Sequence, residues 1–236
     1  MKTNLRSYDV DRALDLRRFY ELLDELEKSI EGGRRLNECS GRMQWPRRGV
    51  YFFMERGETR LHSGSGPRVV RVGTHALKAG AKTTLWTRLS QHKGVARLRA
   101  GNHRGSIFRL LVGASLIARD GLEFPTWGCG STATSEVRKA EMPLELKVSE
   151  TIGRMSVLFL DIEDAAGPAS ARGEIERNCI SLLSVQTGHM VNSTFGDIGN
   201  SFAYLENPVV TSCSAFFHRL QVDPTKQIVT EMNRID

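Results

Sequence analysis

Arg88 and His92 are the residues best placed to act on a substrate, because they lie four positions apart in segment 85–92. In a helix, residues four apart share one face, so the two side chains would stand together. Leu85, Trp86 and Leu89 form an apolar stripe that would hold the helix against a core. The segment therefore predicts a helix with one face for packing and another, with an arginine and a histidine, for chemistry.

The part of the chain around this helix is strongly basic. Residues 41–110 contain 15 Lys and Arg against 2 Asp and Glu, whereas the rest of the 236-residue chain contains 18 against 25. Much of the affinity of proteins for nucleic acid comes from neutralised phosphates and released counterions. Because the basic region coincides with the candidate reactive residues, we favour a nucleic-acid substrate over the alternative of a solvated basic face without a ligand.

Two strands would position the helix. Segments 49–53 and 69–73 are short, β-branched or aromatic runs, and the polar, glycine-containing stretch 55–67 between them predicts an antiparallel hairpin with a long loop. Thr83 or Thr84 would cap the following helix, and Gly94 would end it.

Further elements are predicted on either side. An amphipathic helix is expected over 10–30, with apolar residues on one face. Ser106 would cap a core helix that carries Ile107, Phe108 and Leu111, and a charged helix is expected over 136–152. Segment 155–162 is the clearest strand in the chain, and a final core helix is expected over 174–183.

In their order along the chain, these residues resemble the GIY-YIG endonuclease family. Gly49-Val50-Tyr51 is similar to the first motif, Arg71-Val72-Gly73 to the second, Arg88 with His92 to the helix pair of restriction-type members, and Glu176 to the metal-binding glutamate. Each triplet alone is weak, whereas the ordered set from Gly49 to about Ser184 is fairly specific.

The resemblance implies an α/β fold of the α+β kind, with a small three-stranded antiparallel sheet flanked by helices, and a metal-dependent endonuclease activity. Glu176 would hold Mg²⁺ or Mn²⁺, with Glu174 as the alternative ligand. Tyr51 would take the proton of the attacking water, Arg88 would stabilise charge on the phosphate, and His92 would orient water or hydrogen-bond to Tyr51.

Arg71 stands where the family has the tyrosine of its second motif. A free phenol has a pKa of about 10, so a nearby cation must favour its phenolate if it is to act as a base. Arg71, facing Tyr51 across the strand pair, would supply that cation. On this hypothesis the substitution preserves activity, and the alternative is a degenerate site.

Six basic residues are candidates for contacts with the phosphates of nucleic acid. They precede the first strand, end the Arg88 helix or lie in the glycine-punctuated loop after it: Arg47, Arg48, Lys93, Arg97, Arg99 and Arg104. Trp127, in an irregular insertion, would pack against the protein or stack on a base, and packing is the favoured interpretation.

The expected organisation is an N-terminal helix in 1–36, a nuclease-like domain in 45–184 with an insertion at about 118–150, and a C-terminal extension in 185–236. No apolar run approaches the ~18 residues that a membrane span needs, and no secretory apolar core follows the N-terminus. The four cysteines are far apart and contain no CxxC pair, which predicts isolated thiols. We therefore expect a cytoplasmic protein with no membrane partner.

Two other functions fit the same residues less well. One is a catalytically inactive module that keeps the fold and binds nucleic acid. The other is a structural protein that assembles through the helix at 10–30, and a homodimer or an unidentified protein partner is compatible with either. DNA is the expected polymer, by the resemblance of the Arg and His pair to restriction-type enzymes.

Overall fold

The structure is a computed structural model that describes residues 4–60, 63–95 and 100–183. The predicted C-terminal extension and the candidate phosphate ligands Arg97 and Arg99 lie outside the described residues. The elements in chain order are α1 (Asn4–Ser29), β1 (Arg34–Arg35), η1 (Leu36–Glu38), β2 (Gly49–Thr59), β3 (Pro67–Gly73), α2 (Leu85–Lys93), η2 (His103–Gly105), α3 (Ile107–Asp120), α4 (Ser135–Arg154), β4 (Ser156–Asp161) and α5 (Ala171–Leu183).

The predicted fold class is confirmed, with one correction to the sheet. Within the described residues the antiparallel sheet has four strands in the order β1-β4-β2-β3, rather than three. The additional strand, β1, has two residues and pairs through Arg34 with Val157 of β4. A two-residue arginine strand carries no apolar alternation, so the sequence pattern could not reveal it.

The β2–β3 hairpin is longer than the sequence predicted. β2 continues through the polar residues after Met54 as far as Thr59, which pairs with Pro67, and the backbone N–H of Arg60 donates to the carbonyl of Gly66. Much of the stretch predicted as loop is therefore strand. Backbone pairing with β3 forms it although its side chains are partly exposed.

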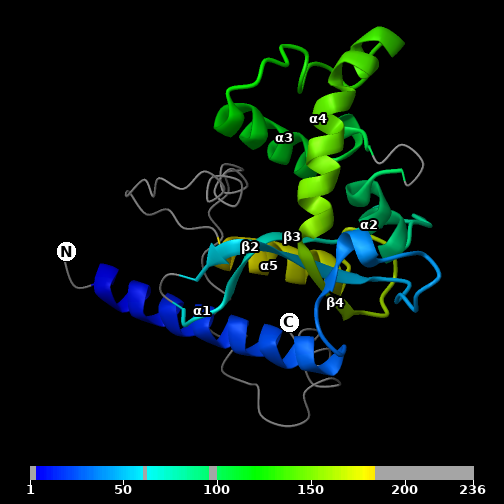
Figure 1. Cartoon of the computed structure of the whole chain (residues 1–236). Coiled ribbons are helices and arrows are strands. Elements are labelled where there is room, and N and C mark those ends of the chain that lie inside the picture. The colour runs from blue at the N-terminus through cyan, green and yellow to red at the C-terminus, as the bar shows by residue number, and fades with distance from the viewer. Residues whose placement is uncertain (1–3, 61–62, 96–99, 184–236) are drawn as a thin grey trace.

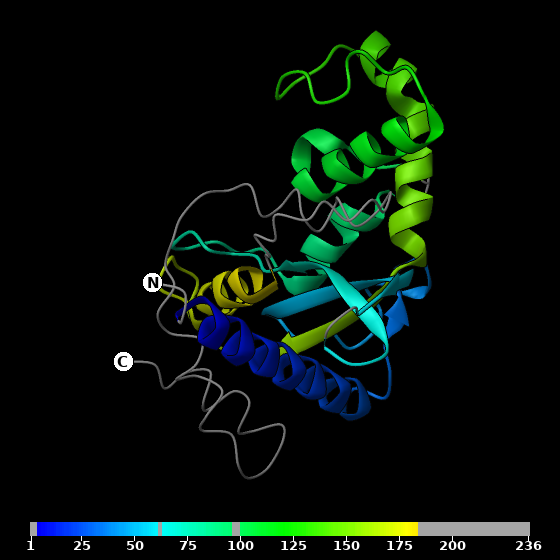
Figure 2. The ribbon, with the colours of Figure 1, turned by 90° about the vertical axis from the view of Figure 1, so that its left-hand side faces the viewer.

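Helices cover the sheet on both faces, and this explains the almost continuous apolar run at the start of β2. Val50, Phe52 and Met54 face a core that includes α1 and α5. Tyr51 and Phe53 face a second core, with α2, α3 and α4. Figures 1 and 2 show α3 and α4 on one side of the sheet and α1 and α5 on the other. Alternate residues of β2 thus serve different cores.

Among the described residues, no helix combines the length and the apolar character required to cross a membrane.

Candidate active site

Local capping fixes α2 as predicted. The hydroxyl of Thr84 accepts a hydrogen bond from the backbone N–H of Thr87, and Gly94 ends the helix with a positive φ of 87°. The prediction that Arg88 and His92 share a face away from the core needs correction. His92 is fully buried beside Leu85 and Leu89, whereas Arg88 is half-buried. His92 lies seven residues after Leu85 and three after Leu89, so the core stripe of the helix includes it.

His92 contacts Tyr51 directly. The Tyr51 Oη and the His92 Nε2 are 2.8 Å apart, and neither side chain is exposed. The rings of Phe53 and Phe108 also surround the imidazole, with centroids 6.0 and 5.4 Å away. Of the two alternatives predicted for His92, the structure shows the hydrogen bond to Tyr51, and its part in catalysis stays a prediction.

The absence of a side chain at Gly73 leaves space for the Tyr51 ring. Tyr51 and Gly73 are directly opposite each other in the β2–β3 ladder. A Cβ atom added at Gly73 would lie 2.3 Å from the Tyr51 Oη. The ring therefore crosses β3 at a residue without a side chain, which is the physical reason for glycine at the end of the second motif.

The other imidazole nitrogen bonds to Ser106. The His92 Nδ1 and the Ser106 Oγ are 2.9 Å apart. The same hydroxyl accepts from the backbone N–H of Arg109 and caps α3, as predicted. The cap was visible in the sequence, but the bond to His92 was not, because it depends on how α2 and α3 pack.

The His92 imidazole is neutral near pH 7. Burial lowers the pKa of His92 well below its usual range, and the positive charges of Arg88, Arg71 and Arg109 lower it further. A neutral imidazole has one N–H and one lone pair. His92 can therefore accept from one hydroxyl neighbour and donate to the other, in either tautomer.

A buried ion pair holds this arrangement in place. Arg109, which has no exposed surface, donates to the Glu145 carboxylate, to the Ser149 hydroxyl at 2.9 Å, and through Nη1 to the His92 carbonyl at 2.7 Å. Sequence reasoning missed this group. The sequence feature that could have indicated the ion pair is a charged residue among the apolar positions of each helix, Arg109 in α3 and Glu145 in α4.

Glu176 reaches the end of β3 from α5. Its Oε1 accepts a hydrogen bond of 3.2 Å from the backbone N–H of Thr74, which follows the second motif. Burial raises the pKa of the Glu176 carboxyl, while the charges of Arg71 and Arg88 oppose that rise. The two arginines therefore favour the charged form of the Glu176 carboxylate.

Arg71 lies on the same sheet face as Tyr51 but not directly opposite it. The register pairs Arg71 with Phe53 and Gly73 with Tyr51, so Arg71 is the diagonal neighbour of the tyrosine. A β-bulge follows at Val70 and shifts the rest of the hairpin. The predicted direct pairing of Arg71 and Tyr51 is therefore wrong in register, although Arg71 still acts electrostatically on both His92 and Glu176.

The residues fit a metal site with one protein carboxylate. The described part of the chain has no cluster of three or more His, Cys, Asp or Glu residues that could hold a metal ion. Mg²⁺ usually keeps several waters and binds one or two carboxylates together with substrate phosphates. Glu176 uses Oε1 for the Thr74 N–H, and its second carboxylate oxygen is the atom that would bind the ion.

Several predicted phosphate ligands have other partners. Arg48 donates to the Asp164 carbonyl at 2.6 Å, and Lys93 donates to the carbonyls of Asn37, in η1, and Cys39, just after it. Arg104 forms a bidentate ion pair with Glu141, with only 4% of its side chain exposed. The charge of Arg104 already has a partner in Glu141, and its contact with phosphate stays a prediction. Among the described candidates, Arg47 is the exposed one.

Trp127 packs within the protein, as the sequence analysis favoured. Its indole N–H donates to the Leu110 carbonyl, and its ring stacks on His103 with centroids 3.8 Å apart. His103 is itself buried and also bonded to Glu145.

The described residues thus form a covered antiparallel sheet with a buried tyrosine–histidine pair, two arginines and a carboxylate at the end of one strand. A family model described as GIY-YIG domain matches residues 10–197. The chain belongs to this family. Comparison with curated proteins and with solved structures found no match.

Proposed function

We propose that the protein is a metal-dependent endonuclease that hydrolyses phosphodiester bonds of nucleic acid, with DNA as the expected polymer. The observation that carries this proposal is the hydrogen bond between the Tyr51 Oη and the His92 Nε2. Family membership, in a family whose members are typically nucleases, supports the same conclusion.

The Tyr51–His92 pair provides a path for a proton. The attacking water would have to reach the buried tyrosine oxygen when the substrate binds. As that oxygen accepts a proton from the water, its own hydroxyl proton would pass to the neutral His92 Nε2. Ser106 bonds the opposite nitrogen and keeps the ring oriented for this transfer. General-base catalysis of this kind contributes about 10²–10⁴-fold to a rate.

Two arginines would supply positive charge to the phosphate. Arg88 and Arg71 would lie beside the non-bridging oxygens, where charge develops during hydrolysis. Glu176 would hold Mg²⁺ or Mn²⁺, which when bound supplies Lewis-acid stabilisation of the phosphate and the departing oxygen. Because burial raises the pKa of Glu176, proton and metal compete for this carboxylate, so we expect metal affinity to increase with pH.

Substitution of Glu176 tests the proposal. Supercoiled plasmid, linear duplex, single-stranded DNA and RNA are incubated with the native chain in Mg²⁺, Mn²⁺ or EDTA. We expect cleavage with a divalent ion, no cleavage in EDTA, and a loss of about 100-fold or more for Glu176→Gln.

Glu174→Gln is the matched control, because Glu174 lies on the same helix and was the alternative ligand. It should cleave like the native chain. Nucleic-acid binding without metal-dependent cleavage would contradict the endonuclease function and favour the inactive nucleic-acid-binding module.

A further inference from the structure

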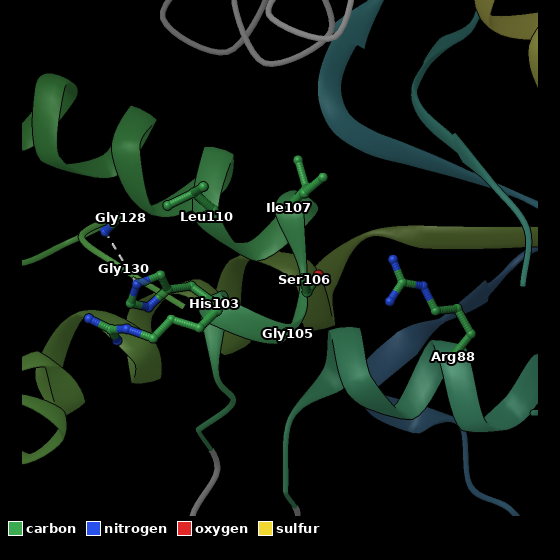
Figure 3. A pocket seen from close by; sticks show the side chains of 9 residues that line it. Arg88, His103, Gly105, Ser106, Ile107, Leu110, Gly128 and Gly130 are labelled. Atoms are coloured by element: carbon green, nitrogen blue, oxygen red, sulfur yellow. Dashed lines mark hydrogen bonds between the residues drawn. The ribbon is translucent and has the colours of Figure 1, made fainter. Parts of the chain in front are cut away.

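A pocket of about 310 Å³ begins at Arg88 and Ser106 and continues to residues that have no part in the proposed chemistry. Figure 3 shows Arg88 extending from α2 toward Ser106 and Ile107 at the start of α3, with Gly128 and Gly130 at the far side. Leu110 and the turn at Gly105 complete the wall. This volume is at the small end of the range for ligand pockets, which begins at about 300 Å³.

The lining is apolar on one side and polar elsewhere. Ile107 and Leu110 present aliphatic surface, and the Ile107 side chain is left 60% exposed although it stands beside the candidate active site. Arg88 supplies a cation at one end, and the glycines supply peptide groups. A nucleotide has the same division, with a flat apolar base, polar base edges and an anionic phosphate.

The walls are held by interactions that do not need a ligand. Arg104 is bonded to Glu141 and donates to the carbonyls of Thr126 and Cys129, at 3.3 and 3.4 Å. The backbone N–H of Gly128 donates to the His103 Nε2 at 3.2 Å. The pocket is therefore largely formed in advance, as ligand sites usually are.

We infer that this pocket binds the base of one unstacked nucleotide next to the phosphate held by Arg88. The inference rests on the proposed function, which identifies the ligand as nucleic acid. A base separated from its stack can be held by apolar contacts on its face and by peptide groups at its edge. The source of that base is either a single strand or a nucleotide extruded from a duplex.

Two substitutions change the pocket without disturbing the core. A Cβ atom at Gly105 would meet no atom within 4 Å, so Gly105→Leu places a side chain in open space at the pocket wall. Ile107→Ala removes an exposed apolar wall. Leu146→Ala, at an apolar residue of α4 that is 39% exposed and does not line the pocket, is the matched control.

The test measures fluorescence anisotropy of the full chain in EDTA with a labelled oligothymidylate and an abasic strand of equal length. We expect the native chain to bind the base-bearing strand about tenfold more tightly. Gly105→Leu and Ile107→Ala should reduce that ratio toward one and leave the affinity for the abasic strand unchanged, whereas Leu146→Ala should keep the ratio. Thermal unfolding of each variant checks that it is folded.

Equal native affinity for the two strands would overturn the inference, as would variants that weaken both strands alike. A paired duplex with one bulged thymidine distinguishes the sources, because tighter binding to the bulge than to the perfect duplex identifies an extruded base. Plasmid cleavage by the same preparation tests the proposed function separately. A base preference without cleavage would support the base-binding pocket and contradict the proposed endonuclease activity. Cleavage without a base preference would support the endonuclease activity and contradict the base-binding pocket.

Discussion

At the scale of single residues, the buried contact between Tyr51 and His92 depends on the absence of a side chain at Gly73. The tyrosine ring occupies the space in which any other residue at position 73 would place its Cβ atom. Burial keeps His92 neutral, and Ser106 fixes its ring. The position of the proposed base therefore follows from steric fit as well as from hydrogen bonding.

Gly73→Ala should displace Tyr51. Forcing an atom into a packed site typically costs about 1–3 kcal/mol, and a misplacement of about 1 Å can cost about 100-fold in rate. We expect both losses, measured by urea unfolding and plasmid cleavage. Gly167→Ala is the control, because a Cβ atom there meets nothing within 4 Å. Native stability and native cleavage in Gly73→Ala would show that the ring does not need this space.

His75 should make stability depend on pH. Burial lowers the pKa of His75 from 6.5 to about 4, so between these values the unfolded chain binds a proton that the folded chain does not. The free energy of unfolding should therefore fall as the pH decreases from 6.5 to 4, by about 1.4 kcal/mol per pH unit at most.

The matched measurement compares the native chain with His75→Gln, whose amide can still donate to the Arg47 carbonyl that the His75 Nε2 contacts. Burial, assisted by Glu58, raises the pKa of Glu55 to about 7, which acts in the opposite sense as the pH falls from 7 to 4.5. Both proteins contain Glu55, so its contribution cancels in their difference. Parallel pH curves for the two proteins would contradict the assignment to His75.

At the scale of elements, the Arg109–Glu145 ion pair joins α3 to α4 and to the last turn of α2. Arg109 has no exposed surface, and its guanidinium bonds to groups from both other helices. Burial lowers the pKa of Arg109, and the carboxylate of Glu145 opposes that shift. The helix that carries His92 is therefore positioned by a charge that requires its partner.

Glu145→Gln should be strongly destabilising, because it leaves the Arg109 charge uncompensated in the core. Removal of one member of a buried pair typically costs about 3–5 kcal/mol. The double substitution Arg109→Met with Glu145→Leu should recover part of that loss, which urea unfolding would reveal. The control is Glu150→Gln on the same helix, whose ion pair with Arg154 is exposed. A cost for Glu145→Gln as small as that of the control would contradict the assignment.

Local signals allowed most elements to be predicted, and contacts between distant segments explain the failures. Thr84 and Ser106 cap helices through bonds to residues three positions away, and Gly94 ends one by its own conformation. By contrast, the pairing of β1 with β4 joins residues about 120 positions apart, and the diagonal position of Arg71 depends on strand register.

At the scale of the whole molecule, the candidate site lies where the two cores meet at the end of β3. Tyr51 and His92 belong to the core that includes α2, α3 and α4, whereas Glu176 comes from α5, on the opposite face of the sheet. The backbone N–H of Thr74, immediately after β3, donates to the carboxylate of this glutamate. Two layers of helices are therefore required to assemble one site.

The ordered motifs allowed the principal site residues to be predicted, but not their surroundings. Tyr51, His92 and Glu176 could be proposed as candidates from residue type and order. The pairing of Arg104 with Glu141 could not, because a count of charges does not reveal which of them already have a partner. Ser106, Arg109 and the pocket beside Arg88 likewise emerge only from helix packing.

The most direct measurement is the single-turnover cleavage rate of Tyr51→Phe, determined together with its affinity for the same nucleic acid. This substitution removes one oxygen atom and keeps the ring that packs over Gly73. The account predicts a rate at least about 100-fold below that of the native chain, with unchanged affinity. Cleavage by Tyr51→Phe at the native rate would contradict the claim that the Tyr51–His92 pair moves the proton.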